Sequence, residues 1–216
     1  MPIAFDAASR IASSNAPTHT FSHTVTGSDR VLLVGAYRYG SVDDPVTGVT
    51  YAGVSMARLG YINQANPGYK VYIYGLAAPT TGANDIVITA TGAGELGGAG
   101  ASYTGVSQTG LPDASNTASA GSGTSLAIAN TSVADNCWTV MFALNQWANF
   151  SAGASTTLRT SGANLAFFDS NAAKTPAGSV TLTGTWGGSA ANAGVIVSIA
   201  PFVASARSRL LLLGVS

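Results

Sequence analysis

Apolar and polar residues alternate with period two along most of the chain, and few stretches show the spacing of an amphipathic helix. Residues 20–26 (TFSHTVT) alternate cleanly, as expected for a strand with one buried face. Residues 30–37 (RVLLVGAY) instead form a near-continuous apolar run, which is typical of a central strand buried on both faces. Further strands are predicted at 46–51, 55–61, 69–76, 85–91, 99–104, 124–129, 138–144, 156–160, 165–168, 180–186 and 194–202.

Turn signals separate these runs, and together they predict an all-β fold, an antiparallel β-sandwich with about ten or more short strands. Two polar stretches with small residues and proline, 111–123 and 170–178, are expected to be loop tips. A domain linker is the alternative for 111–123. Because similar strand patterns resume on both sides of it, we predict a single β-sandwich domain over residues 1–204, followed by a tail at 205–216. No tandem repeat is visible in the sequence.

Composition narrows the classes of function. Ala, Gly, Ser and Thr make up 110 of the 216 residues, and charged residues only 8%, against about 25% in an average domain. The formal net charge is zero, which argues against binding to nucleic acid or to an anionic membrane surface. Neither a signal peptide nor an apolar stretch long enough to span a bilayer is visible, so we expect synthesis in a cytoplasm.

Residues that could carry chemistry are few. His19 and His23, four apart on a strand, would lie about 13 Å from each other, too far to bind one metal ion. We expect them to be polar side chains of a half-exposed strand, and the single Cys137 to be a small core residue. Acidic residues are scattered, apart from Asp43 and Asp44 in a turn, and no nucleophile elbow is present. These features predict a protein without catalytic residues, metal or cofactor.

Aromatic residues are the better candidates for contacts. On one strand Tyr37 and Tyr39 share a face, and on another Tyr72 and Tyr74 do so. These tyrosines either line the interior of the sandwich or form a rigid platform for a sugar or a protein. Trp147 lies among amide side chains just past a predicted strand. Tyr39 and Trp147 are therefore candidate exposed contact residues.

The C-terminal tail joins positive charge to a leucine run. No acidic residue lies in the last sixteen positions. Burial of four leucines is worth at most about 6–12 kcal/mol, so these side chains are expected to leave water. They either form the last strand of their own sandwich or dock on a neighbouring subunit or partner. The candidate contact residues of the tail are Arg207, Arg209, Leu210, Leu211, Leu212 and Leu213.

Several short motifs along the chain occur in a familiar order. They are FDAAS at 5–9, FSHTVTGSDRVLLVG at 21–35, VTYAGV at 49–54, VYIYGL at 71–76, PTTGAN at 79–84 and SYTGV at 102–106. Together they resemble a jelly-roll-like β-sandwich module of bacterial extracellular proteins and of structural proteins of tailed bacteriophages. The resemblance covers most of residues 1–200.

This resemblance implies a non-enzymatic virion protein and carries over no catalytic residue. The expected role is decoration or cementing of a phage capsid by bridging neighbouring capsid subunits. The implied partners are the major capsid protein and copies of the chain itself, as a homo-oligomer on the particle. The alternative is a carbohydrate- or receptor-binding module of a tail fibre or bacterial surface protein, with Trp147 and Tyr39 in contact with the ligand.

Overall fold

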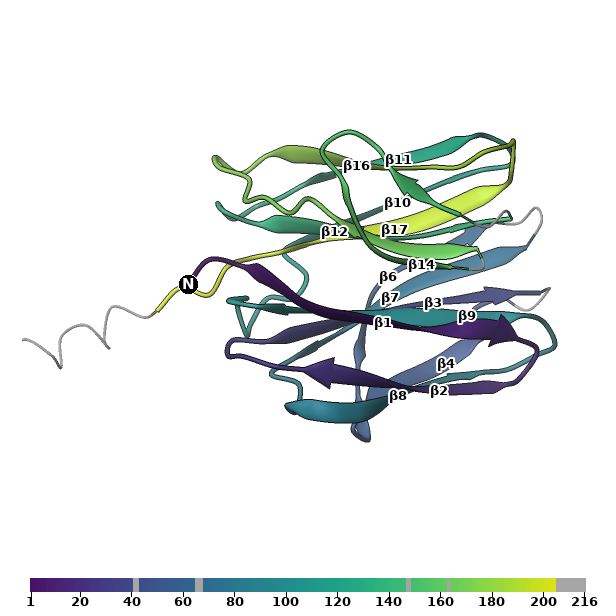
Figure 1. The fold of residues 1–216 in the computed structure, drawn as a ribbon, viewed down its shortest axis with the longest axis horizontal. Helices are drawn as coiled ribbons and strands as arrows, with labels where there is room; N and C mark the ends of the chain where they lie inside the picture. Colours follow the sequence, from purple (N-terminus) through teal and green to yellow (C-terminus); the bar gives the residue numbers. More distant parts are fainter. Residues whose placement is uncertain (41–42, 65–67, 147–148, 163, 205–216) are drawn as a thin grey trace, which may run out of the picture.

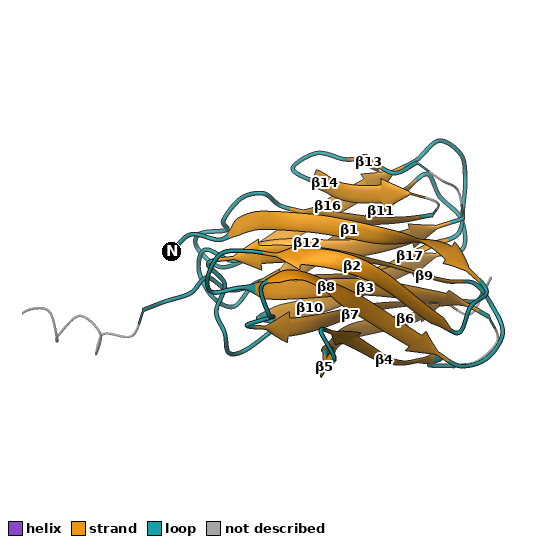
Figure 2. Ribbon diagram, turned by 60° about the horizontal axis from the view of Figure 1, so that its bottom comes forward, coloured by secondary structure: helices purple, strands orange, loops and turns teal. Residues whose placement is uncertain are grey.

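The computed structural model describes residues 1–40, 43–64, 68–146, 149–162 and 164–204. Across these ranges the chain forms strands, turns and bends but no helix, which confirms the predicted all-β fold (Figure 1 and Figure 2). Accordingly, no helix in this part of the chain is long and apolar enough to cross a membrane. The strands form four sheets, and the paired strands in them are antiparallel.

The sheets are numbered here by their place in the sequence, with strands given in spatial order. Sheet I contains β1 (Ala4–Ser14), β9 (Leu96–Thr104), β3 (Val31–Tyr39), β7 (Tyr69–Ala77) and β6 (Ala57–Gln64). Sheet II contains β2 (Thr18–Val25), β8 (Gly82–Ala90), β4 (Val46–Tyr51) and β5 (Val54–Ser55). Sheet III contains β10 (Ala114–Ala120), β17 (Asn192–Ile199), β12 (Trp138–Asn145), β15 (Leu165–Asp169) and β14 (Thr157–Gly162). Sheet IV contains β11 (Ser125–Thr131), β16 (Ser179–Thr185) and β13 (Ser151–Ala152).

These sheets are stacked in the order II, I, III, IV (Figure 1). One hydrophobic core fills the N-terminal sandwich of sheets II and I, and another fills the C-terminal sandwich of sheets III and IV. The third and largest core lies between sheets I and III and joins the two sandwiches. Residues 1–204, expected to form one sandwich, therefore contain two, packed face to face. That they fold as a single unit stays a prediction.

Both sandwiches have the same strand order. In each, the first strand pairs with the last one and the second strand with the one before the last, as in a jelly roll. Strands β1, β9, β3, β7 and β6 of sheet I correspond to β10, β17, β12, β15 and β14 of sheet III. Strands β2, β8 and β4 correspond to β11, β16 and β13. The chain thus contains a repeat of topology, although the sequence shows no tandem repeat.

Two contacts between sheets I and III also occur in pairs: where a strand of sheet I contacts a strand of sheet III, the two corresponding strands contact each other as well. Strand β1 lies against β14, and the corresponding β10 lies against β6. Likewise β9 lies against β15, and the corresponding β17 lies against β7. Two-fold symmetric dimers show this reciprocity, in which each contact occurs twice. The matching strand orders and these two reciprocal contacts show that the two sandwiches face each other in a similar way, as the halves of a two-fold dimer do.

Burial on both faces explains the apolar runs of the central strands. In β3, Leu33 points into the shared core while Leu32 and Val34 point into the N-terminal core. In β12, Phe142 points into the shared core while Met141 points into the C-terminal core. Neither strand has a face in water, so neither needs alternating polar residues. This confirms the prediction of a doubly buried strand at 30–37.

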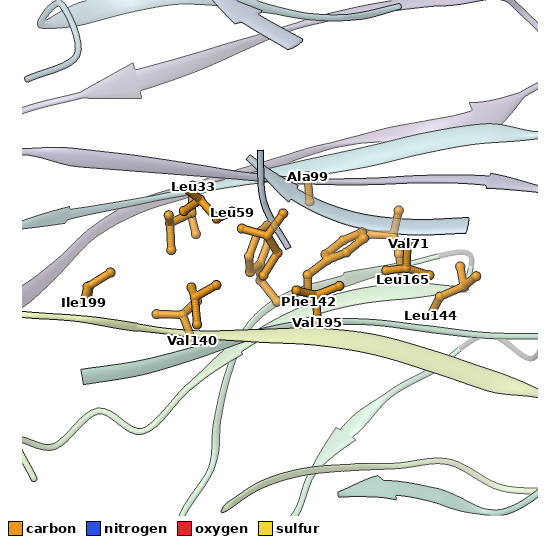
Figure 3. Close-up of a cluster of buried hydrophobic side chains, with 14 of the residues drawn as sticks. Leu33, Leu59, Val71, Ala99, Val140, Phe142, Leu144, Leu165, Val195 and Ile199 are labelled. Carbon is orange, nitrogen blue, oxygen red and sulfur yellow. The ribbon is translucent and has the colours of Figure 1, made fainter. Parts of the chain in front are cut away.

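The middle of the shared core is built around one aromatic ring and one glycine. Phe142 projects from β12 toward sheet I and is fully buried (Figure 3). A Cβ at Gly35 of β3 would lie 2.2 Å from the Phe142 ring. Only a glycine therefore leaves room for this ring, and the close approach fixes how the two sheets fit together.

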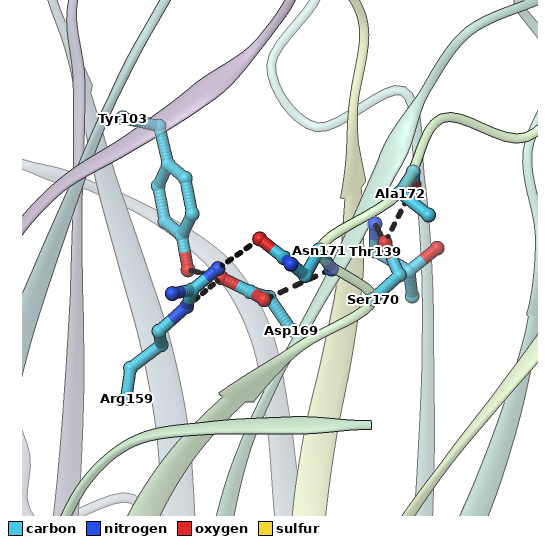
Figure 4. A network of polar contacts seen from close by, with 7 residues as sticks. All are labelled: Tyr103, Thr139, Arg159, Asp169, Ser170, Asn171 and Ala172. Atoms are coloured by element: carbon cyan, nitrogen blue, oxygen red, sulfur yellow. Dashed lines mark hydrogen bonds and ion pairs between the residues drawn. The ribbon is translucent and has the colours of Figure 1, made fainter. Parts of the chain in front are cut away.

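A buried polar network ties one edge of the shared core together (Figure 4). Asp169 of β15, fully buried, accepts hydrogen bonds from the Tyr103 hydroxyl at 3.1 Å and from Arg159 Nε at 2.6 Å. Arg159 Nη2 donates to Asn171 Oδ1 at 2.7 Å, and its guanidinium lies 4.2 Å from the centre of the Phe5 ring. Because Tyr103 and Phe5 belong to sheet I, this network links the two sandwiches.

The expectation of a loop at 111–123 is wrong. Residues Ala114–Ala120 form β10, which pairs with β17 over its whole length. It lies at the edge of sheet III, so a strand with small polar side chains suffices there. The chain passes from one sandwich to the other just before β10, between residues 105 and 113.

Candidate interaction surface

An apolar groove lies at the end of the molecule where the N-terminus meets the last described residues, on the left in Figure 1. Its volume is about 640 Å³. The groove is lined by Met1, Pro2, Ile3, Asn136, Trp138, Ala173, Pro201, Phe202, Val203 and Ala204. Residues from both sandwiches thus form its walls.

Backbone pairing between distant segments builds this groove. Phe202 N donates to Gly105 O, and Ser107 N donates to Ala200 O, each at 2.8 Å. The terminal amino group of Met1 donates to Phe202 O at 3.5 Å. Trp138, at the start of β12, packs edge-to-face on Tyr103, with 6.3 Å between ring centres. The stretch around Phe202 is thereby held between the N-terminus and the connection that joins the two sandwiches.

A second cavity of about 620 Å³ lies on the other side of Pro201–Val203 and has a more polar lining. Gln108, Asp135 and Asn136 contribute to its walls. The Asp135 carboxylate accepts a hydrogen bond from Ala177 N at 2.7 Å, and Asp113 accepts bonds from Val133 N and Ala134 N beside it. Two carboxylates therefore lie beside the apolar groove.

Exposed apolar side chains gather at the same end. Within the described ranges five large apolar residues are exposed, and three of them belong to this region: Met1 (64%), Val133 (76%) and Val203 (80%). Contiguous apolar surface is uncommon on monomeric proteins and marks sites of interaction. This end, with its apolar groove and acidic neighbours, is the candidate interaction surface.

The structure does not bring the residues proposed from sequence to this surface. Tyr39 is 42% exposed and packs on Tyr69, with 5.3 Å between ring centres, at the far end of β3 from the groove. Tyr37, Tyr72 and Tyr74 are buried, which confirms that these rings line the interior. Trp147 lies outside the described residues, as do all candidates of the tail: Arg207, Arg209, Leu210, Leu211, Leu212 and Leu213.

Sequence reasoning missed the groove residues themselves. In the sequence, Trp138 and Phe202 are simply the end residues of two predicted strands, and Ile3 lies near the N-terminus outside any predicted strand. Period-two alternation contains no information about contacts between residues two hundred positions apart. The sequence signal for a groove at this place is the apolar character of two short stretches, residues 1–5 and 199–203, which lie near opposite ends of the described chain.

A further cavity of about 600 Å³ opens between sheets I and II, beside β4 and β6. Its lining includes Asp44, Arg58 and Tyr74. Arg58 forms an exposed ion pair with Asp44 at 2.7 Å, and its guanidinium lies 5.6 Å from the centre of the Tyr61 ring. A carboxylate, a guanidinium and aromatic rings are suited to hydrogen bonding and stacking with a polar ligand such as a sugar.

His19 and His23 belong to β2, in which exposed and buried residues alternate, as expected of a half-exposed strand, and both side chains lie on its buried face. Both project from β2 toward sheet I, because alternate residues of β2 face the interior. His19 Nε2 lies 2.9 Å from Ser14 Oγ. This bond satisfies one ring nitrogen of His19, whereas the buried Nδ1 has no hydrogen-bond partner among the described residues.

His23 belongs to a chain of hydrogen bonds whose residue types resemble a catalytic relay. Its Nδ1 lies 2.7 Å from Ser9 Oγ, and its Nε2 lies 3.0 Å from Ser102 Oγ. Ser102 Oγ in turn donates to Asp6 Oδ2 at 2.8 Å. His23 is 2% and Ser102 0% exposed, so the imidazole does not face a surface that a substrate can reach. The network instead ties β1, β2 and β9 together.

Acid is expected to destabilise the fold through His23. Burial lowers its pKa from 6.5 to about 4, although the Asp6 carboxylate opposes this, while the unfolded chain binds the proton near pH 6.5. Between these pH values the unfolded state holds a proton that the folded state lacks, so stability falls as the pH falls from 6.5 to 4. The pKa difference corresponds to about 3 kcal/mol. Urea unfolding at pH 7, 5 and 4 measures this loss.

The control for this pH effect is His23→Gln, which keeps a hydrogen-bonding side chain but does not titrate. Its stability is expected to fall by about 3 kcal/mol less than that of the unmodified chain between pH 7 and pH 4. Asp6 and His19 remain in both proteins, and the difference isolates the imidazole of His23. Parallel pH profiles for the two proteins would contradict the prediction.

The described residues contain no group of three or more His, Cys, Asp or Glu side chains placed to hold a metal ion. Cys137 is buried, as expected. Burial, with the nearby Asp113 carboxylate, raises the pKa of its thiol to about 12, which keeps the sulfur protonated at neutral pH.

Comparisons with protein-family models, with curated proteins and with solved structures found no match to this chain. Inference about function therefore rests on the residues, the fold and the surface described above.

Proposed function

We propose that this chain is a non-enzymatic structural protein of a bacteriophage particle, which decorates or cements the capsid by bridging neighbouring subunits. The observation that carries this proposal is the apolar end of the molecule, where the groove and the exposed Met1, Val133 and Val203 lie together. An exposed apolar surface of this kind gains stability when a partner protein covers it. Its partners would be the major capsid protein and neighbouring copies of the chain.

The outer faces of sheets II and IV also support the proposal. In β2 the outward residues are Thr18, Thr20, Ser22 and Thr24, and in β16 they include Thr181 and Thr183. Faces with few charged side chains, such as Asp85 on sheet II, let copies lie close together on a shell with little like-charge repulsion. The resemblance to phage structural modules points to the same role.

Mass spectrometry of purified particles tests the location. We expect the chain in a copy number of the same order as that of the major capsid protein. A much smaller number would favour a tail or fibre component, and absence from the particle would overturn the virion proposal.

Binding to particles that lack the chain tests the surface. Val203→Asp places a charge at an exposed groove position and is expected to weaken binding by at least about tenfold, because the carboxylate must be desolvated in the interface. Deletion of 207–216 is also expected to weaken binding. Tyr39→Ala, at the far end of the molecule, is the matched control and should bind normally. Equal binding by the Val203 and Tyr39 variants would contradict the use of this surface.

The alternative function is carbohydrate or receptor binding by a tail fibre or a bacterial surface protein. The cavity beside Asp44, Arg58 and Tyr74 favours it, because its side chains suit a polar ligand. A glycan-binding screen distinguishes the two functions, with Arg58→Ala and Trp147→Ala as separate variants. A sugar preference that either variant removes would support this alternative, whereas a cement protein should show none.

A further inference from the structure

We propose that the apolar groove is a docking site for the C-terminal segment of the same chain, residues 205–216. Three observations converge on this pairing: where the described chain ends, what lines the groove, and how charge is distributed between the two parts. The inference concerns the isolated chain, in which no partner covers the groove. On a particle the segment would leave the groove to the partner and contact that partner itself, so its deletion would still weaken binding. The inference goes beyond the proposed function and can fail or hold independently of any role on a particle.

The end of the described chain places the segment beside the groove. Ala204, the last described residue, is itself part of the groove lining. Leu210 follows six residues later, and six extended residues span about 20 Å, which allows the chain to turn and come back. A tethered segment has an effective concentration in the millimolar range. This favours docking within one chain over docking on a second copy at ordinary protein concentrations.

The chemistry of the two surfaces is complementary. The groove offers Met1, Ile3, Trp138 and Phe202, and the segment offers the four consecutive leucines 210–213. Leucines in this groove would be removed from water together with Val203, which is 80% exposed without a cover.

The distribution of charged residues also favours docking of the segment on the rest of the chain. All nine acidic residues of the chain precede residue 205, whereas two of the nine Lys and Arg residues, Arg207 and Arg209, follow it. Side chains of residues 1–204 therefore carry a net charge of −2 and those of the segment +2. Asp135 lines the cavity that adjoins the groove, so an arginine that precedes the leucines would approach its carboxylate.

A cysteine pair tests the docking and its connectivity. Leu211→Cys is combined with Ala173→Cys, an exposed position in the groove lining, and the protein is oxidised at low concentration. We expect a disulfide within one chain, seen as a monomer of increased mobility on a non-reducing gel. Leu211→Cys with Ala127→Cys, exposed on the outer face of sheet IV, is the matched control and should not cross-link. The native Cys137 is buried and present in both pairs.

The other outcomes of this cross-linking experiment overturn the proposal. A disulfide-linked dimer from the Ala173 pair would show that the groove takes the segment of a second copy. Equal cross-linking of both pairs, or none, would show that the segment has no preferred site.

Proteolysis of the unmodified chain provides an independent readout. Trypsin cleaves after Arg207 and Arg209, and docking should protect both bonds. Leu211→Asp with Leu212→Asp weakens docking without touching the sandwiches, and we expect cleavage to be about tenfold faster in this variant. Equal cleavage rates in the two proteins would overturn the docking. Because neither experiment involves particles, its failure is distinguishable from failure of the proposed function.

Discussion

Replacement of Asp169 by alanine is expected to lower the free energy of unfolding by about 3–5 kcal/mol. Asp169 is fully buried and accepts hydrogen bonds from both Tyr103 and Arg159. Its removal leaves the Tyr103 hydroxyl and Arg159 Nε without their acceptor at the edge of the shared core, where water is largely excluded. Urea unfolding at neutral pH, with both proteins measured in the same buffer, gives the difference.

The second ion pair of the described residues is the matched control. Arg58 and Asp44 are 2.7 Å apart, close to the 2.6 Å of the buried pair, but their side chains are 43% and 50% exposed, against 14% and 0% for Arg159 and Asp169. Water screens the exposed pair, so Asp44→Ala is expected to cost no more than about 1 kcal/mol. Similar losses in the two variants would show that the Asp169 network does not stabilise the junction of the sandwiches.

Truncation of Phe142 to alanine is expected to cost about 3–5 kcal/mol. This ring fills the middle of the core between sheets I and III, where Leu33 and Val195 are also buried (Figure 3). Its loss leaves a cavity between sheets I and III, which neither sheet can close alone. Thermal or urea unfolding of the variant measures the effect.

A double-mutant cycle tests whether Gly35 is the partner of that ring. Gly35→Ala alone is expected to cost about 1–3 kcal/mol, because its methyl group would overlap with Phe142. In the Phe142→Ala protein the same methyl enters the vacated space, so the two losses should not add. Gly121→Ala, where no atom lies within 4 Å of the added carbon, is the control. Additive losses would show that the close approach of Gly35 and Phe142 does not determine sheet packing.

The sequence predicts best the strands in which burial of one face or of both faces produces a simple pattern of apolar residues. Residues 30–37 and 138–144 are almost entirely apolar, apart from Arg30 and Thr139, because β3 and β12 are covered on both faces. In β2 and β11, by contrast, one face is covered, and buried residues strictly alternate with more exposed ones. Period two is a direct consequence of burial on one side of a pleated strand.

The two longer strands that the sequence pattern misses are β1 and β10. They occupy corresponding positions, each at the edge of its five-stranded sheet and paired with a central strand on one side. The residues of both strands are half-exposed or exposed, and small polar side chains such as those of Ser115 and Thr117 suit such positions. An edge strand is held by backbone hydrogen bonds with its neighbour. Because these bonds do not require particular side chains, they produce no clear pattern in the sequence.

By itself, the sequence determined the all-β class, the central strands and the burial of Cys137, because these follow from local alternation and apolar content. Tertiary structure alone decided that there are two sandwiches, that His23 and Asp169 are buried, and that an apolar groove forms where Met1 meets Phe202, 201 residues away. These features arise from contacts between residues far apart in the chain. The type of a side chain does not specify which distant residue it will contact, and that is decided only when the sheets pack against one another.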